Sequence, residues 1–349
     1  MNFWRRWLGE NRLTAFMLFF VVVLYSFLMF MAAFTKPSTA PSSIKAQQNP
    51  MLTSAELKQK EEVVRKSLME KPRLMSILSL AFFGTLVWGI LLDMLLIHWR
   101  REKRPWISTT LPKAPVCWNM NDVFQALVLL FFIEGCLFLF QLFGYWLTGL
   151  ELSPDFLLLT NSLIRDVAAA VFVLLLVARR QGRPFADLGL RREKAGLFVK
   201  TGLLAYVAIV PLLVISFIVL GFFLQVFSYE PAPQNVVQMY LKPSSENYLI
   251  FFTVFVAGIG PVLEEIFFRG FAFAALRQRL GFWKAAALTS FLFSMFHMNA
   301  VVFVPIFFLG LFLCYLYEST GSLVPSISAH ILHNTIMVLM TLGFRFLSQ

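Results

Sequence analysis

Long apolar runs separated by short polar stretches dominate this chain. A helix needs about 20 residues to cross a hydrocarbon layer of about 30 Å, and most of the runs reach that length. They lack the alternation of apolar and polar positions that marks membrane strands, and an open sheet could not satisfy its backbone in lipid. The pattern predicts an all-α, polytopic transmembrane bundle of about nine helices, at residues 13–34, 74–97, 123–147, 156–178, 197–227, 248–273, 285–297, 300–317 and 323–346.

Composition supports the membrane class. Hydrophobic residues make up 58% of the chain and charged residues 14%, with forty phenylalanines, which is more apolar surface than a soluble core can bury. Composition predicts an integral multi-pass membrane protein, with the lipid bilayer as a partner. The odd number of cysteines, Cys117, Cys136 and Cys314, indicates neither a disulfide framework nor a thiolate metal cluster.

Basic residues predict the orientation, because short loops rich in Lys and Arg stay in the cytoplasm. Three such loops follow the second, fourth and sixth predicted helices and would share one side, while the alternate loops carry almost no cations. The net charge of +11 is thereby assigned to topology, and no nucleic-acid partner is predicted. The stretch 36–73 is rich in lysine yet falls on the other side, although its length and its glutamates weaken it as a topology signal.

Three sequence domains follow from the pattern. Residues 1–115 form an N-terminal membrane extension of two helices and a polar loop, 116–247 hold the helices that precede the core, and 248–346 form the core. The first helix is too long for the apolar part of a secretory signal and is read as a retained anchor. Thr53 and Glu56 form a capping-box pattern, so the polar stretch after them is either a short helix outside the bilayer or a flexible linker.

Candidate chemistry begins with Glu264, Glu265 and Arg269, which lie in the otherwise apolar segment 248–273. Ionisable groups at that depth are costly unless they are paired or functional. Glu265 and Arg269 are four residues apart, the spacing of an ion pair on one helix face. Glu264 points about 100° away, so it is predicted to face a cavity and accept a proton from water, whereas Glu265 is structural.

The following apolar segments add His297, His330 and Asn334. His330 and Asn334 are also four residues apart, so both can face the same cavity, and they are the donors that suit a developing oxyanion. His297 could orient the attacking water with Glu264 or bind a metal. The sequence therefore predicts a buried polar cavity with catalytic residues Glu264, His297, His330 and Asn334, supported by Glu265 and Arg269.

Each feature has a structural alternative. A Glu/Arg pair in a membrane often fastens helices or lines a transport path, so a transporter, or an immunity or scaffold factor that uses the pocket only for binding, is the alternative function. Phe293 is assigned to packing, and His333 is taken as a neighbour of His330 rather than a ligand. His98, beside Trp99 and Arg100, occupies an interfacial position that needs no function.

The motifs Glu264-Glu265-x-x-x-Arg269, Phe293-x-x-x-His297 and His330-x-x-x-Asn334 resemble the CPBP intramembrane proteases, the family of type II CAAX prenyl endopeptidases and bacteriocin-processing relatives. The resemblance covers residues 248–340, and the stretch 188–192 is similar to one that often precedes that core. It implies a peptidase that acts on a peptide or protein substrate in or at the membrane, prenylated or not, and a location in a bacterial plasma (inner) membrane. It also implies Glu264 as the base that activates water, assisted by His297, with His330 and Asn334 stabilising the oxyanion.

A metal is not required by this pattern. The family has been described both as metalloproteases and as glutamic proteases, and this chain has no His-Glu-x-x-His motif, so zinc would need ligands from three helices. The prediction is a cofactor-free glutamate mechanism, with zinc as the alternative. Counting about 1.5 Å per residue places Glu264 about 6 Å and His330 about 10 Å from the cytoplasmic edge, which agree, and His297 about 20 Å from it, which does not.

Overall fold

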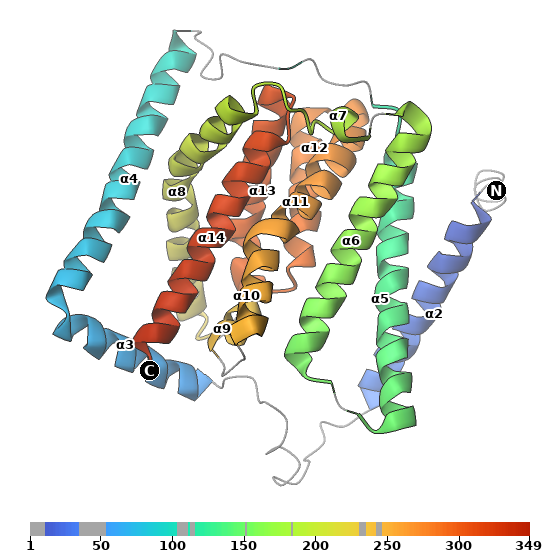
Figure 1. Ribbon diagram of the computed structural model, residues 1–349, viewed down its shortest axis with the longest axis horizontal. Coiled ribbons are helices and arrows are strands. Elements are labelled where there is room, and N and C mark those ends of the chain that lie inside the picture. The colour runs from blue at the N-terminus through green and yellow to red at the C-terminus, as the bar shows by residue number, and fades with distance from the viewer. Residues whose placement is uncertain are drawn as a thin grey trace. The chain divides into compact units, whose positions relative to one another are not determined.

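The computed structural model describes residues 11–34, 54–102, 111, 116–150, 152–182, 184–229, 235–241 and 246–349. Regular structure in these residues is all helical, as predicted, and none of them lies in a strand. The elements, most of which Figure 1 labels, are α2 (Arg12–Phe34), α3 (Ser54–Glu70), α4 (Pro72–Arg101), α5 (Met120–Thr148), α6 (Pro154–Gln181), α7 (Pro184–Asp187), α8 (Ala195–Val226), α9 (Asn235–Leu241), α10 (Glu246–Val254), η1 (Phe255–Ile259), α11 (Gly260–Glu265), η2 (Ile266–Phe273), α12 (Ala274–Phe296), α13 (Ala300–Thr320) and α14 (Val324–Leu347).

The chain divides into two compact units that differ from the three sequence domains. Unit 1 comprises Met1–Pro50 and Trp118–Leu176, and unit 2 comprises Met51–Cys117 and Val177–Gln349. The predicted extension 1–115 is therefore shared between them, with α2 in unit 1 and α3 and α4 in unit 2. In unit 1, α2 packs on α5 through Phe20 and Phe132, whose ring centroids are 4.9 Å apart. The predicted core 248–346 lies wholly in unit 2.

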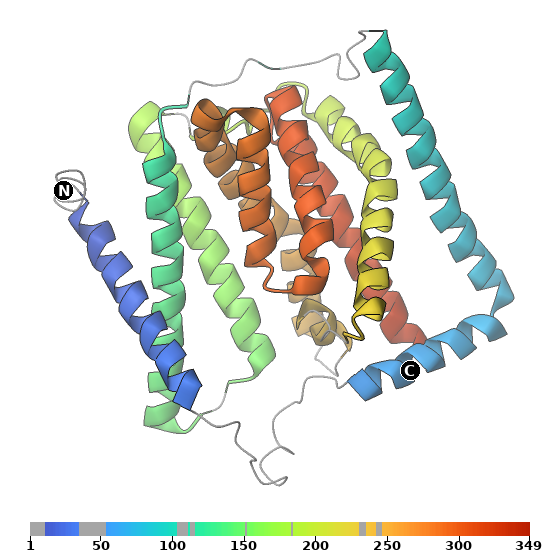
Figure 2. The ribbon, with the colours of Figure 1, turned by 180° about the vertical axis from the view of Figure 1, so that it is seen from behind.

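The core of unit 2 is formed where α8, α13 and α14 pack side by side (Figure 2). Small residues allow close approach, as is common between membrane helices. A Cβ added at Gly202 of α8 would lie 2.3 Å from the Pro325 carbonyl oxygen of α14. A Cβ added at Gly310 of α13 would lie 2.8 Å from the Ser290 Cβ of α12. The first approach fixes the start of α14 against α8, and the second holds α13 against α12.

Eight helical stretches of the described residues are long and apolar enough to span a membrane. One of them, Tyr248–Phe296, has 49 residues, which is twice the length of a single crossing. Gly281 breaks it with φ 72° and ψ 175°, a conformation that favours glycine. The chain then folds back on itself. As a result, the ring centroids of Phe293 and Phe296 in α12 lie 5.1 and 5.8 Å from the ring centroid of Phe268 in η2. The segments 248–273 and 285–297, which were predicted as two membrane helices, thus fall within one of the eight stretches.

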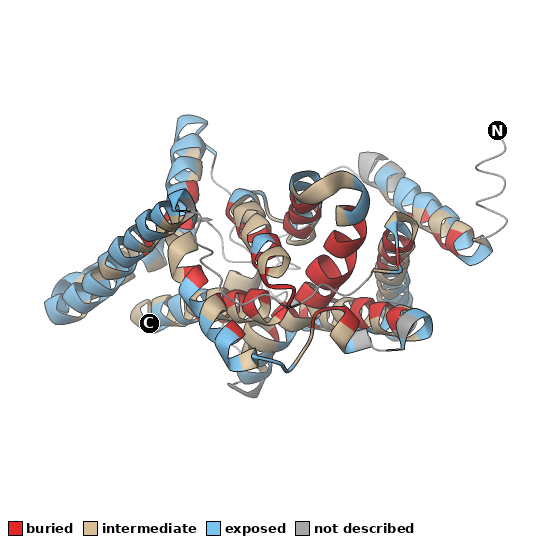
Figure 3. Ribbon diagram, turned by 90° about the horizontal axis from the view of Figure 1, so that it is seen from above, coloured by how far each residue is buried: buried red, intermediate tan, exposed pale blue. Residues whose placement is uncertain are grey.

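Burial is concentrated around the middle of this folded segment. All eight residues of η2 are buried, whereas α2 and α4 are mostly exposed, as lipid-facing helices are, and Figure 3 shows this contrast. The stretch 266–273 is therefore packed by protein on every side, although its sequence is as apolar as that of the exposed helices.

Three groups of cations lie at one end of unit 2. They occupy the end of α4, the segment before α8 and the turn at Gly281, which Figure 1 places at the same end of the helices. The polar helix α3 packs against α14 and α4 at the opposite end. The capping-box pattern predicted this helix, and the alternative of a flexible linker is not what the structure shows. Thr53 itself lies outside the described residues. The arrangement agrees with the side assigned to each stretch from its charges.

Candidate active site

Both glutamates lie on α11, a six-residue helix between two π-helical segments, η1 and η2. A π-helical turn interrupts the regular hydrogen bonds and occurs often at functional sites. Pro261 explains the first interruption, because proline has no backbone N–H to donate. The predicted kink at Gly260 and Pro261 is therefore present as a change of helix type rather than as a break.

The Val256 carbonyl is the group that this interruption leaves without a helical donor. In a π-helix it would accept from residue 261, which is proline, and the Gly260 N–H donates instead to the Phe255 carbonyl. Asn334 of α14 supplies the donor, with its Nδ2 2.8 Å from the Val256 oxygen. The amide thereby ties α14 to η1, and its second N–H has a fixed direction.

The predicted ion pair between Glu265 and Arg269 is formed and fully buried. Arg269 Nη1 lies 2.7 Å from Glu265 Oε1, and the two side chains are 1% and 0% exposed. Arg269 Nη2 donates to the Gly310 carbonyl at 3.4 Å, and its guanidinium carbon lies 4.4 Å from the centroid of the Phe293 ring. The packing assigned to Phe293 is thus specific, because the ring supports the arginine by a cation–π contact.

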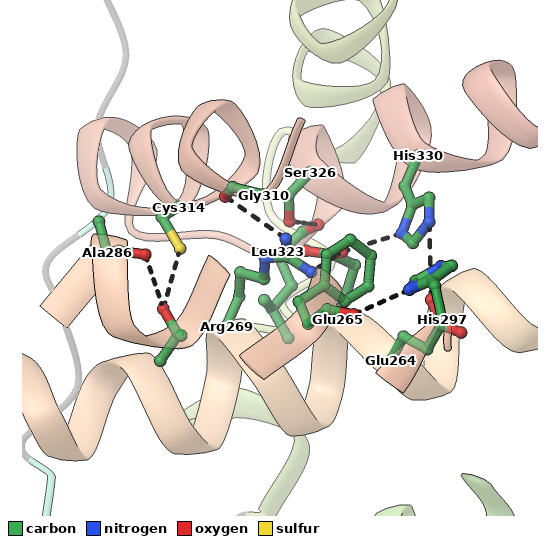
Figure 4. A network of polar contacts seen from close by, with 12 residues as sticks. Glu264, Glu265, Arg269, Ala286, His297, Gly310, Cys314, Leu323, Ser326 and His330 are labelled. Carbon is green, nitrogen blue, oxygen red and sulfur yellow. Dashed lines mark hydrogen bonds and ion pairs between the residues drawn. The ribbon is translucent and has the colours of Figure 1, made fainter. Parts of the chain in front are cut away.

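His330 joins the two glutamates, which sequence reasoning had treated separately. Its Nδ1 lies 3.0 Å from Glu265 Oε1 and its Nε2 lies 3.6 Å from Glu264 Oε2. Because a carboxylate accepts, Nδ1 donates to Glu265 and the other nitrogen faces Glu264. Figure 4 shows the ring between α14 and the helix that carries both acids. Arg269, Glu265, His330 and Glu264 thus form one connected polar chain.

The two acids differ in access to water, in the sense predicted from their helix faces. The Glu264 side chain is 22% exposed and that of Glu265 is 0% exposed. Glu264 Oε2, which faces His330, is itself buried, so the exposure lies elsewhere on that side chain. Glu264 is therefore the carboxylate of this pair that a water or a substrate can reach.

His297 follows the last residue of α12, and Figure 4 places it beside Glu264. Its Nδ1 lies 2.8 Å from the Phe293 carbonyl oxygen. A carbonyl accepts, so Nδ1 carries the proton and Nε2 of the neutral ring is an acceptor. An acceptor nitrogen beside a carboxylate is suited to orienting a water.

The depths of these groups now agree. The helix that carries Glu264 continues past Phe273 to the turn at Gly281. Glu264 lies about 25 Å before that turn and His297 about 24 Å after it, at about 1.5 Å per residue. The predicted segment ended at Phe273, whereas the helix continues to the turn at Gly281. Arg277, the next cation after the buried Arg269 toward the turn, is about 20 Å along the helix from Glu264.

Among the residues that the structure describes, no three or more His, Cys, Asp or Glu side chains are grouped so that they could hold a metal ion. A histidine that binds zinc through Nε2 usually donates its other ring N–H to a carboxylate, which is the relation of His330 Nδ1 to Glu265 Oε1. The cofactor-free mechanism and the zinc alternative, with His297, His330 and a glutamate as ligands, therefore both stay predictions.

One polar pair was missed from the sequence. Tyr206, buried in α8, lies with its hydroxyl 3.0 Å from His333 Nδ1 of α14. The two residues are 127 positions apart, so no local spacing could have connected them. The only signal was a hydroxyl inside an apolar run, and buried tyrosines usually have a hydrogen-bond partner.

The fold and the buried polar chain define an integral multi-pass membrane protein with an all-α bundle. Residues 246–336 match the family model for Type II CAAX prenyl endopeptidase Rce1-like proteins. The family resemblance stated from the motifs is confirmed over that part of the chain, which contains the residues described above.

A second comparison agrees with the first. The chain is 33% identical over 84 residues to a protein of Bacillus subtilis (strain 168) named "Putative membrane peptidase YdiL". The match covers 24% of this chain and 34% of that protein, so the chain spans about a third of that relative's length. No solved structure matches the chain.

Proposed function

We propose that the protein is an intramembrane endopeptidase that hydrolyses a peptide bond of a membrane-associated or hydrophobic substrate. The observation that carries the proposal is the His330 ring between the Glu264 and Glu265 carboxylates, buried within the matched segment 246–336. Four ionisable side chains in contact inside apolar helices are costly to maintain, which favours use in chemistry. The relative's name and the family's description support a peptidase.

In the proposed reaction, Glu264 accepts a proton from a water that His297 Nε2 orients. The resulting hydroxide attacks the carbonyl carbon of the peptide, and the carbonyl oxygen becomes an oxyanion. Hydrogen bonds from the second Asn334 N–H and from Nε2–H of His330, with that ring protonated on both nitrogens, would stabilise that charge. Glu264 then gives its proton to the leaving nitrogen, the C–N bond breaks, and a carboxyl and an amine are released.

Glu265 and Arg269 act through His330 in this proposal. The Glu265 carboxylate accepts from Nδ1 at 3.0 Å and fixes the direction of the ring, while Arg269 balances the charge of the carboxylate. They are positioning residues, because their buried side chains, at most 1% exposed, are out of reach of a substrate. No step requires a metal ligand.

The substrate class is proposed from the family description. A C-a-a-X substrate has a prenylated cysteine followed by three residues, and its lipid would hold the peptide in the bilayer in which the site lies. A bacterial inner membrane is the proposed location, in line with the bacterial relative.

The first prediction tests the base. Glu264→Gln keeps the size of the side chain but cannot accept the proton, so cleavage should fall by at least about 1,000-fold. Purified protein in lipid nanodiscs would be assayed with two quenched peptides, one carrying a farnesylated cysteine and three further residues, the other its unprenylated twin. Cleavage of the first peptide alone supports the prenyl class, and cleavage of both supports a general hydrophobic substrate.

Folding is the control for that assay. The melting temperature of Glu264→Gln should match that of the wild type, since Glu264 is partly exposed and its isostere keeps the contacts. Near wild-type cleavage by a folded Glu264→Gln protein would exclude the assigned mechanism. A wild type that binds either peptide but cleaves neither would favour the binding alternative.

A further inference from the structure

His333 and Tyr206 form a second polar pair close to the site, and the proposed reaction does not use it. His333 lies three residues after His330 on α14, within the range of electrostatic interaction with both His330 and His297. Its Nδ1 is 3.0 Å from the hydroxyl of Tyr206, and the two rings meet edge to face with centroids 5.8 Å apart. A histidine inside a membrane helix is costly unless it has a function or a partner.

The pair has a defined tautomer. Tyr206 is 4% exposed, and a buried hydroxyl must place its hydrogen on an acceptor. His333 Nδ1 is the acceptor within reach, so Tyr206 donates to it. The neutral His333 ring then carries its own proton on Nε2. In the described part of the chain, no hydrogen-bond partner of Nε2 is found. Nε2 is also not one of the fully buried polar atoms that lack a partner.

The neighbouring donors are partly committed. Asn334 uses one N–H on the Val256 carbonyl, and His330 uses Nδ1–H on Glu265. His333, which lies on α14 between these two residues, therefore offers an N–H that the described protein does not use. An oxyanion in a water-poor site gains most from donors whose direction is fixed in advance, and the Tyr206 hydroxyl provides that fixing for His333.

We propose that His333 is a further donor of the active site, and that its Nε2–H, fixed by Tyr206, binds the carbonyl oxygen of the scissile peptide. This inference rests on the proposed peptidase function. Tyr206 is the positioning residue, because it acts through His333. The alternative is that the pair only fastens α8 to α14, in which case stability, and not the rate of the chemical step, would depend on it.

The test is a double-substitution cycle measured with the farnesylated peptide in nanodiscs. His333→Leu should lower kcat about 100-fold with little change in KM, because one transition-state donor is lost. His333→Gln should recover at least about tenfold of that loss, since its amide can donate from a similar position. Tyr206→Phe should lower kcat about tenfold, because part of the rings would adopt the other tautomer. In the His333→Leu background, Tyr206→Phe should have no further effect.

Tyr240→Phe is the matched control. Tyr240 is also buried and its hydroxyl lies 3.0 Å from Thr253 Oγ1, but the pair joins α9 to α10 away from the histidines. Its removal should leave kcat unchanged. Suppose that Glu264→Gln abolishes activity under the same conditions. A folded His333→Leu protein with wild-type kcat would then overturn the role of His333 and leave the peptidase proposal intact. Activity retained in both would overturn the peptidase proposal itself.

A measurement that needs no substrate covers the case in which His333→Leu does not fold. Nitrogen-15 NMR of histidine-labelled protein, with His333 assigned by comparison with His333→Gln, should show an unprotonated Nδ1 and a protonated Nε2. Tyr206→Phe should give a mixture of both tautomers. A protonated Nδ1 in the wild type would overturn the proposal, since the proposed donor atom would then carry no hydrogen.

Discussion

The Arg269 guanidinium makes three buried contacts, and these contacts predict what happens when they are removed. The guanidinium binds Glu265, reaches the Gly310 carbonyl and lies over the Phe293 ring. Arg269→Ala and Glu265→Ala should each lower stability by about 3–5 kcal/mol, because either change leaves a buried charge without its partner. Thermal unfolding in detergent, followed by the loss of monodisperse protein, measures the effect.

Arg277→Ala is the control for this prediction. Arg277 pairs with Glu318 at 3.0 Å, but its side chain is 41% exposed. An exposed pair is worth about 1 kcal/mol or less, so this variant should unfold close to the wild-type temperature. Equal unfolding temperatures for Arg269→Ala and Arg277→Ala would contradict the structural role assigned to the buried pair.

The residue types of the site could be predicted from sequence, but their contacts only in part. Spacing of four residues identified the Glu265–Arg269 pair, and helix geometry separated Glu264 from Glu265. The contact of His330 with both acids crosses between helices 65 residues apart in sequence. The bond from Asn334 to Val256 also depends on a hydrogen-bond vacancy that Pro261 creates on another helix. Local periodicity carries no information about either contact.

At the scale of elements, the close approach of α8 and α14 predicts a large difference between two glycines of one helix. A Cβ at Gly202 would lie 2.3 Å from the Pro325 carbonyl oxygen, so Gly202→Ala should force α14 away and cost about 1–3 kcal/mol. Because α14 carries His330 and Asn334, cleavage should also fall. Gly196→Ala on the same helix meets nothing within 4 Å and should be neutral or stabilising by up to about 1 kcal/mol.

The measurement is the unfolding temperature of both alanine variants together with their kcat on the farnesylated peptide. A Gly202→Ala protein as stable and active as Gly196→Ala would show that the two helices do not pack as described. The sequence could not distinguish these glycines, because both lie near the start of the same apolar helix and differ in what faces them.

Hydropathy predicted where the helices lie, but it did not predict where the helix that carries Glu264 ends. Apolar length located the membrane segments, since about 20 residues must be apolar in each crossing. The helix that carries Glu264 continues beyond Phe273 through the polar residues before Gly281, because a helix can extend out of the hydrocarbon layer once its side chains reach water. That one boundary had placed Glu264 and His297 at different depths, and the turn at Gly281 brings them level.

At the scale of the whole molecule, the cations at one end of unit 2 predict which face of the membrane each loop occupies. Arg277 and Arg279 precede the Gly281 turn, and cytoplasmic loops are enriched in such residues. Ser228, after the end of α8, lies at the other end of a 32-residue helix. We therefore expect Gln278 on the cytoplasmic side and Ser228 on the outside.

Cysteine labelling in intact cells tests this orientation. Cys117, Cys136 and Cys314 would be replaced first, because two of them are exposed. Gln278→Cys, at an exposed position, should resist a membrane-impermeant thiol reagent until the cells are opened, and Ser228→Cys should react at once. Glu264 lies about 20 Å along its helix from Arg277, so a substrate entering from the cytoplasm would have to bring its scissile bond past the basic end of that helix. The reverse labelling pattern would place the basic end outside and direct the search for substrates to lipid-anchored proteins of the outer leaflet.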